Sequence, residues 1–216
     1  MKPLLLLLAL PLTAHASWFE LEAGAGVTIF QTENGRWYQE GMPDNRFTKI
    51  APEYSAGVTG ALVSRGAWGV DWHADYVNLG RAAASCQCDT SDSDYAAHTT
   101  KHTAYYTGSG RAQGVALTVE PYRWYGGWRF GAEAGAYFYH STWSEQVYGW
   151  TASDAPPVNL RLSATGWHVA PVIGMSISKD SWSVNYRHYF LKRNIKGQNV
   201  PPLWNDADVI EIKRRF

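Results

Sequence analysis

The chain has 216 residues, 19 basic against 19 acidic side chains, and an aromatic content of 14%. A formal net charge of zero gives no reason to expect a nucleic-acid partner. The mean hydropathy is −0.31, and after residue 16 no apolar stretch approaches the roughly 20 residues that a transmembrane helix needs. This composition leaves two classes, a secreted soluble β protein or a transmembrane β-barrel.

Residues 1–16 have the pattern of a secretory signal peptide. Lys2 precedes the apolar run Leu4 to Leu10, and Ala14-His15-Ala16 supplies a small-residue cleavage site. The run is too short to span a membrane, and the alternative of a buried N-terminal strand explains neither Lys2 nor the cleavage site. We therefore expect a cleaved signal peptide at residues 1–16 and a single domain at residues 17–216.

The rest of the chain reads as segments of about ten residues in which apolar and polar side chains alternate, the period of a β-strand. We predict eight strands, at about residues 18–30, 53–64, 67–79, 111–123, 128–140, 161–178, 181–191 and 207–216. Short turns near Arg65, Gly126 and Asp180 alternate with longer connections at about 32–52, 81–110, 142–160 and 192–206. Strict alternation of short turns and long loops is typical of outer-membrane barrels.

Aromatic residues gather at the strand ends on the apolar face. One predicted girdle contains Phe19, Trp68, Tyr125, Trp128 and Trp182, and the other contains Tyr54, Tyr76, Phe138, Trp167 and Phe190. Two girdles that flank a band of small and branched residues are the membrane-interface pattern. The fold class that we predict is all-β, an eight-stranded antiparallel up-and-down transmembrane β-barrel.

By this topology and pattern, the chain resembles the small eight-stranded outer-membrane barrels of Gram-negative bacteria. The resemblance implies an outer-membrane location with both termini in the periplasm, a monomer, and contact with outer-membrane lipids and lipopolysaccharide. It also implies that the last strand is read by the barrel-assembly machinery through outward apolar positions and a final aromatic. Ile210, Ile212 and Phe216 match that pattern, whereas Arg214 departs from it, and its stem is expected to snorkel to the headgroups.

The inward positions are ionic and of both signs, so we expect the interior to be filled rather than open. The acids are Glu20, Glu22, Asp71, Asp75, Glu120, Glu133 and Glu211, and the bases are Arg129, Arg187, Lys213 and Arg215, with His73 and His168. Because the first and last strands must pair to close the barrel, we expect ion pairs from Glu20 and Glu22 to Lys213 and Arg215 across the seam.

Two patterns raise metal and disulfide chemistry. Asp71-x-His73-x-Asp75 places three metal-ligand types on one strand face, but alternate strand residues are about 6.6–7 Å apart, which favours the ionic interior over a metal. Cys86-x-Cys88, expected in the second long loop, is a disulfide candidate in an exported chain, with free thiols or interchain pairing as alternatives. No cofactor is expected.

One segment suggests an enzyme. Some small outer-membrane barrels are lipid A deacylases, with a His and then a Ser two residues later near the external end of a late strand. His188 occupies a similar place, but Phe190 stands at the Ser position, and Glu211, the acid on the next strand, is expected to face inward. His140-Ser141 is a second adjacent pair without an evident acid. A hydrolase needs nucleophile, base and orienting group within reach, so we predict a protein without catalytic residues.

The remaining candidates lie in the loops. Their aromatic residues are either ligand contacts or packing within the loops themselves: Tyr105, Tyr106, Trp143, Tyr148 and Trp150. We expect a structural or adhesive surface protein that binds a host or environmental ligand through four extracellular loops. The alternatives are a lipid-modifying hydrolase of the outer leaflet and a narrow channel.

Overall fold

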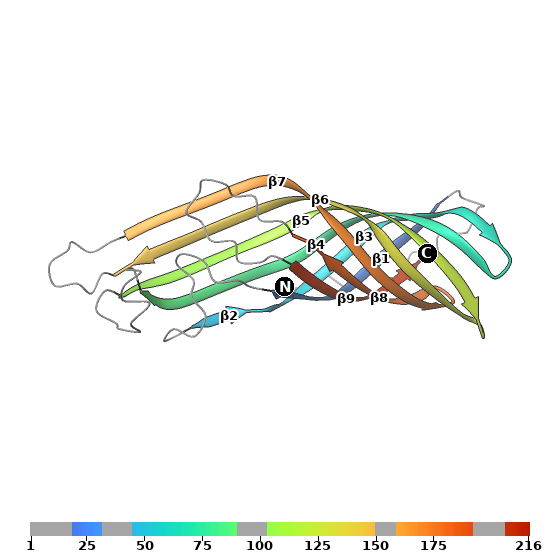
Figure 1. The fold of residues 1–216 in the computed structure, drawn as a ribbon, viewed down its shortest axis with the longest axis horizontal. Helices are drawn as coiled ribbons and strands as arrows, with labels where there is room; N and C mark the ends of the chain where they lie inside the picture. Colours follow the sequence, from blue (N-terminus) through green and yellow to red (C-terminus); the bar gives the residue numbers. More distant parts are fainter. Residues whose placement is uncertain (1–18, 32–44, 90–102, 150–158, 192–205) are drawn as a thin grey trace, which may run out of the picture.

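We describe a computed structural model of the protein, which places residues 19–31, 45–89, 103–149, 159–191 and 206–216. The expected signal peptide at residues 1–16 lies outside the described residues. Among those residues, no helix has the length and hydropathy needed to cross a membrane. The described chain consists of strands and turns (Figure 1).

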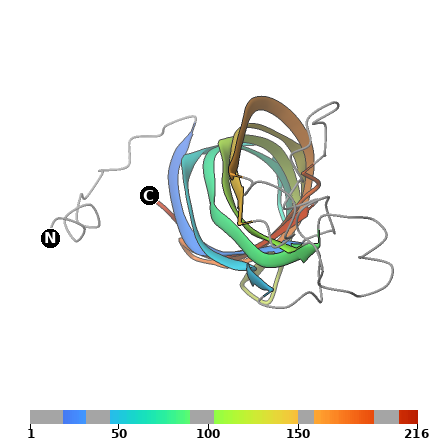
Figure 2. The same cartoon turned by 90° about the vertical axis from the view of Figure 1, so that its left-hand side faces the viewer.

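The strands are β1 (Glu20–Gln31), β2 (Arg46–Thr48), β3 (Ile50–Arg65), β4 (Trp68–Asp89), β5 (Thr103–Tyr125), β6 (Trp128–Tyr148), β7 (Asn159–Lys179), β8 (Trp182–Tyr189) and β9 (Asp206–Arg215). All their pairings are antiparallel, and β3 to β9 each follow their sequence neighbour around the sheet. The sheet closes where β1 pairs with both β3 and β9. Viewed from one end, the strands form a closed ring (Figure 2), which confirms the predicted eight-stranded up-and-down barrel.

Tight turns join the strands at one end of the barrel. They follow Arg65, Tyr125 and Lys179, and Gly66 (φ 61°) and Gly126 (φ 58°) adopt the left-handed conformation that such turns require. We call this the short-turn end; Phe216 lies there too, as the C label in Figure 1 indicates. The other end, from which the longer connections leave, is the long-loop end.

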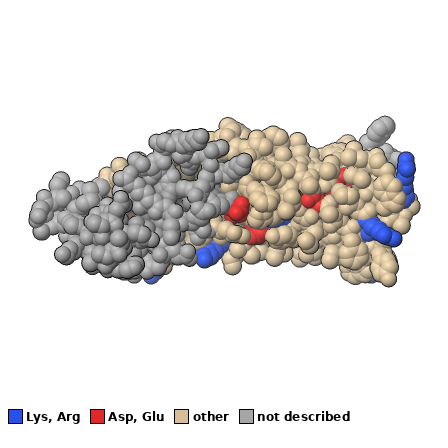
Figure 3. Space-filling view, viewed as in Figure 1, with Lys and Arg blue, Asp and Glu red and all other residues tan. Residues whose placement is uncertain are grey.

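The outer wall of the barrel is apolar. Val115, Leu117, Val169, Ile173 and Met175 are exposed between the two predicted girdles, and all ten girdle aromatics are exposed as well. In Figure 3 most of the face in view is uncharged, a few acidic side chains appear along the middle of the barrel, and basic side chains appear at the short-turn end. An exposed apolar belt of this extent marks a surface that is covered by lipid or by another protein.

Strands extend into two of the predicted connections. β4 and β5 stay paired as far as Asp89 and Thr103, and β6 and β7 as far as Tyr148 and Asn159. The expectation of loops was therefore wrong for residues 81–89, 103–110, 142–148 and 159–160. Beyond the girdle nearest the long connections, several inward residues are small, such as Ala82 and Ala84, and several outward ones are polar, such as Ser85 and Thr107. This weakens the apolar alternation that predicts a strand.

The four long strands form an external sheet beyond the barrel, to which β2 adds a short edge. β2 pairs with β4 at Arg46, Phe47 and Thr48, a ninth strand inside a connection that we expected to be a loop. The inward face of this sheet continues the hydrophobic core of the barrel: Tyr106, Trp143 and Val147 are buried there, and Phe47 and Leu162 pack against this core. The external sheet is therefore a built extension of the barrel.

Candidate functional site

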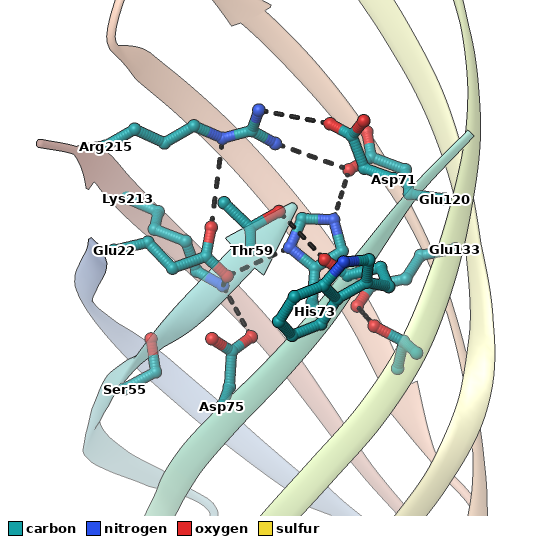
Figure 4. Close-up of polar contacts among 12 residues, drawn as sticks. Glu22, Ser55, Thr59, Asp71, His73, Asp75, Glu120, Glu133, Lys213 and Arg215 are labelled. Atoms are coloured by element: carbon teal, nitrogen blue, oxygen red, sulfur yellow. Dashed lines mark hydrogen bonds and ion pairs between the residues drawn. The ribbon is translucent and has the colours of Figure 1, made fainter. Parts of the chain in front are cut away.

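The interior of the barrel toward the short-turn end holds a network of charged side chains from six strands (Figure 4). His73 lies at its centre, with Nδ1 2.9 Å from Glu22 Oε1 and Nε2 2.8 Å from Glu120 Oε2. Asp71 receives Arg129 Nη2 at 2.7 Å and Arg215 Nη1 at 3.3 Å. Alternation explains this convergence, because each of these residues is an inward position of its strand.

A second layer of the network surrounds Arg187. Its guanidinium donates from Nε to Glu133 Oε2 and from Nη2 to Asp75 Oδ2, both at 2.8 Å. Lys213 Nζ is 2.7 Å from the same Asp75 oxygen and 3.2 Å from Glu22 Oε1. Glu211 completes the layer at 3.4 Å from Arg187. We expected Glu20 and Glu22 of β1 to pair with Lys213 and Arg215 of β9. Glu22 lies near both of these bases, and its Oε2 is 3.8 Å from Arg215 Nε.

Glu20 stands apart from the other acids of the predicted network. It is exposed at the beginning of β1 and pairs in the sheet with Thr59, and no ion pair joins it to any residue that the structure describes. The alternation was correct, but Glu20 lies at the open rim of the short-turn end, where water reaches the carboxylate.

Glu22, His73 and Asp75 offer three ligand atoms within 4.8 Å of one another. The ammonium group of Lys213 lies between the two carboxylates, at hydrogen-bond distance from each, and both His73 nitrogens already face carboxylates. A protein cation therefore fills the position that a metal ion would take, and the arrangement favours an ionic network.

The interior is packed at this level. The cavity among Glu22, Glu133, Arg187 and Lys213 has a volume of about 10 Å³, close to the smallest space that holds one water molecule. On the long-loop side of the network, the centre of the Tyr137 ring lies 4.9 Å from that of Tyr189 and 5.0 Å from that of Tyr139. These layers leave no wide path through the described part of the barrel.

His188 faces outward near the long-loop end and has an acid partner that we did not predict. Its Nδ1 is 2.8 Å from Asp208 Oδ1, the same oxygen that accepts a hydrogen bond from the Tyr186 hydroxyl at 2.6 Å. Gln31 donates to the other Asp208 oxygen at 2.9 Å. His188 and Asp208 are directly opposite each other on β8 and β9. This pair could be predicted only from the pairing register of the two strands, which the sequence does not give. Glu211, as expected, faces inward.

Among the residues that the structure describes, no serine, threonine or cysteine hydrogen-bonds to this pair. Phe190 packs its ring 4.4 Å from the His188 ring, at the position where a serine would be needed. The polar partners of His188 among the described residues are Asp208 and, at 3.9 Å, Asp206. Neither carries the hydroxyl or thiol group that nucleophilic acyl transfer requires.

His140 and Ser141 lie on opposite faces of β6. His140 faces outward, where its Nε2 is 2.8 Å from Thr165 Oγ1 and its ring is 5.1 Å from that of Trp167. Ser141 is the next residue of an extended strand and therefore faces inward. The two side chains cannot act as a base and nucleophile pair.

Cys86 lies in β4, paired with Tyr106 of β5, and not in a loop as we predicted. It is buried in the core of the external sheet and is disulfide-bonded. The side chain of Cys88 lies outside the described ones, so its pairing with Cys86 stays a prediction. The chain contains two cysteines.

The loop aromatics divide between the two faces of the external sheet. Tyr106 and Trp143 are buried inward, which supports the packing alternative for both. Tyr105 and Tyr148 are exposed, with their rings stacked at 5.6 Å. Trp150 lies outside the described residues.

One carboxyl group is buried in the external sheet. Glu145 is 4% exposed, and its Oε2 accepts a hydrogen bond from the Trp143 indole at 3.2 Å. Burial raises the pKa of Glu145 to about 7, although hydrogen bonds from Trp143 and Tyr106 act in the opposite direction. This group is therefore poised to change its charge near neutral pH.

The closing strand presents the predicted apolar positions. Ile210, Ile212 and Phe216 are exposed on the outer wall. The Arg214 guanidinium lies between aromatic rings, 5.3 Å from the centre of Trp182 and 5.1 Å from that of Phe216, so cation–π contacts hold its stem against the girdle. The role of this strand as an assembly signal stays a prediction.

No protein-family model matches the sequence, and no curated protein matches it. Solved structures similar to the chain include two of Ail, the attachment invasion locus protein of Yersinia pestis. One, in complex with the heparin analogue sucrose octasulfate, has a TM-score of 0.41 and 8% identity over 92% of this chain and 97% of that chain. The other has a TM-score of 0.40 and 10% identity over the same shares. At these values the likeness concerns the fold alone.

Proposed function

We propose that this protein is a monomeric outer-membrane β-barrel that binds a ligand at the cell surface and catalyses no reaction. The exposed apolar belt between two aromatic girdles supports membrane insertion. Ring closure supports it as well, because it leaves no barrel strand with an unpaired edge that lipid would have to cover. In this proposal the long-loop end faces outward, contacts lipopolysaccharide and carries the ligand, and the short-turn end lies in the periplasm.

The observation that carries the proposal is the external sheet. β5 extends from Tyr125 at the short-turn end to Thr103, and β6 extends to Tyr148, ten residues past the girdle residue Phe138. At about 3.4 Å per residue this adds about 34 Å of strand beyond the apolar belt. Such an extension with a buried core is not needed to anchor the barrel, which supports a role in presenting a binding surface.

The alternatives have weaker support. The ionic and tyrosine layers fill the interior, which disfavours a channel. His188 and Asp208 form a hydrogen-bonded pair on the outer wall, but no serine, threonine or cysteine of the described residues joins them. For a hydrolase, His188 could serve as the base and Asp208 as the orienting acid, but the described residues supply no serine, threonine or cysteine nucleophile beside them.

The test removes the external sheet and keeps the barrel. Joining Ala82 to Gly110 and Thr142 to Thr165 through Asn-Gly turns shortens both hairpins at paired residues. Cells that display the native or the shortened protein are compared for attachment to arrays of glycans and matrix proteins. We expect cells with the native protein to attach to at least one surface and cells with the shortened protein to lose that attachment. Resistance of the shortened protein to unfolding in unheated detergent shows that its barrel is folded.

Two results contradict the proposal. One is equal attachment by native and shortened proteins, which would place binding elsewhere on the molecule. The other is no attachment by either, combined with an altered lipid A acylation pattern that disappears in a His188→Ala variant. That second result would make the protein an enzyme.

A further inference from the structure

The outward face of the external sheet is hollowed. A shallow groove of about 730 Å³ crosses β2, β4, β5, β6 and β7. Its side chains alternate with those of the buried core: Ser85 and Thr107 line the groove, whereas their neighbours Cys86 and Tyr106 are buried on the opposite face. The groove therefore lies on the same face as the lipid-exposed belt, but beyond the girdle.

Three arginines line this groove, Arg46, Arg81 and Arg161. None of them forms an ion pair with a carboxylate of the described residues, whereas the interior bases Arg129, Arg187 and Lys213 are all paired. Glu145, the acid that contributes to the lining, is 4% exposed and points its carboxyl group to Trp143 in the core. The groove is therefore positive, and no described acid neutralises it on that face.

Hydroxyl groups complete the surface. Six line the groove, on Thr48, Ser85, Thr107, Ser109, Ser144 and Ser163. The register sets Ser109, Ser144 and Ser163 side by side across three strands, so they form a row of short donors beside the longer arginines. Arginine forks with neutral hydroxyl donors match the oxygens of a phosphate or sulfate group, which accepts several hydrogen bonds and carries full charge at neutral pH.

The height of the groove limits the source of such a group. Ser163 and Arg161 lie four and six residues beyond the girdle residue Trp167 on β7, about 13–20 Å along the strand. In the proposed orientation this is the sugar layer above the lipid headgroups, and the groove faces sideways into it. We propose that the groove binds a phosphorylated or sulfated sugar through Arg46, Arg81 and Arg161.

This inference rests on the proposed function for its orientation only. The shared chemistry has two sources, the phosphorylated core of lipopolysaccharide in the same membrane and a sulfated glycan from outside the cell. The probes that separate them are lipopolysaccharide with an intact phosphorylated core, the same material after enzymatic dephosphorylation of the core, dextran sulfate, and neutral dextran. The protein is the full barrel, refolded into lipopolysaccharide-free nanodiscs.

The decisive variant is R46Q/R81Q/R161Q, matched by R65Q/R123Q/K179Q, which removes three charges from exposed positions at the short-turn end. We expect native protein and the matched variant to bind at least one anionic probe, and the groove variant to bind it at least tenfold more weakly. The native affinity should fall as salt rises, and this dependence should weaken in the groove variant. An Arg161→Lys variant keeps the charge but loses the fork, and should fall in between.

The outcomes separate the sources and the proposals. Preference for phosphorylated core assigns the groove to lipopolysaccharide, and preference for dextran sulfate assigns it to an external glycan. Unchanged affinity in the groove variant, or binding of neutral dextran as tight as of dextran sulfate, overturns the inference. So does the absence of anion binding by native protein; if attachment still depended on the external sheet, the proposed function would stand without it.

Discussion

Arg187 shows how a single residue holds the interior together. It is 2% exposed and contacts carboxylates from three other strands, Asp75, Glu133 and Glu211. Replacing it with methionine keeps most of the volume but leaves these acids without their main cation. Breaking a buried ion pair in this way typically costs about 3–5 kcal/mol.

We therefore expect Arg187→Met to lower the free energy of unfolding by about 3–5 kcal/mol, measured by urea titration in detergent micelles. Arg123→Met, at an exposed position near the short-turn end, is the control and should change it by less than about 0.5 kcal/mol. Equal effects of the two substitutions would mean that the network contributes little to stability.

Glu145 predicts a pH dependence of the external sheet. Its pKa of about 7 in the folded protein lies above the ordinary value of 4.5, so the folded state holds the proton more tightly than the unfolded state. The contribution of the protonated carboxyl group is complete below about pH 4.5 and is lost as the pH rises through about 7.

Native protein should accordingly lose stability relative to a Glu145→Gln variant as the pH is raised from 6 to 8. The loss approaches about 1.4 kcal/mol per pH unit between the unfolded pKa of 4.5 and the folded pKa of about 7, and the curve flattens above that value. Urea unfolding of both proteins at several pH values, followed through tryptophan fluorescence, measures the difference. Parallel curves for the two proteins would show that the carboxyl group is not buried as described.

At the scale of the strand, Gly80 allows β4 to continue out of the barrel. It adopts φ 79° at the irregularity between Asn78 and Arg81, where its N–H donates to the Asn78 side chain at 2.9 Å. A Cβ atom there would collide with the backbone carbonyl oxygen of Pro52. This irregularity shifts the alternation of β4 by one residue and so sets which side chains of the external sheet face inward.

Gly80→Ala should destabilise the protein more than Gly66→Ala. Both residues have positive φ values, but a Cβ at Gly66 meets nothing within 4 Å. The matched pair therefore separates the conformational cost of a positive φ, roughly 1–2 kcal/mol, from the cost of the collision. We expect a further loss of about 1–3 kcal/mol for Gly80→Ala, measured by urea unfolding; similar losses would mean that β4 relaxes around the added methyl group.

For the whole molecule, the sequence predicted the barrel because lipid imposes one strong pattern on its outer wall. Leu117, Val169 and Ile173 face outward and alternate with inward residues that are mostly small or polar, and every girdle aromatic is exposed as expected. The external sheet escaped prediction because lipid no longer selects its outward side chains: Ser85, Thr107 and Ser144 read as loop residues.

The unknown strand register limits what could be predicted about function. His188 was visible as a candidate, but its partner Asp208 depends on the β8–β9 register, which no local pattern fixes. The arginines of the groove are 35 and 80 residues apart in sequence, at 46, 81 and 161, and only strand pairing brings them to one surface. Sites assembled from several strands require the register before they can be recognised.

In the proposed topology, the long-loop end with its external sheet faces the outside of the cell, and this orientation can be measured directly. Ser163→Cys places a thiol in the external sheet and Lys179→Cys places one at the short-turn end, each in a Cys86→Ser/Cys88→Ser background. A membrane-impermeant maleimide is applied to intact cells, and permeabilised cells, in which both positions should react, serve as the control. We predict labelling at position 163 and none at 179 in intact cells. Labelling at 179 with none at 163 would invert the barrel and contradict the account.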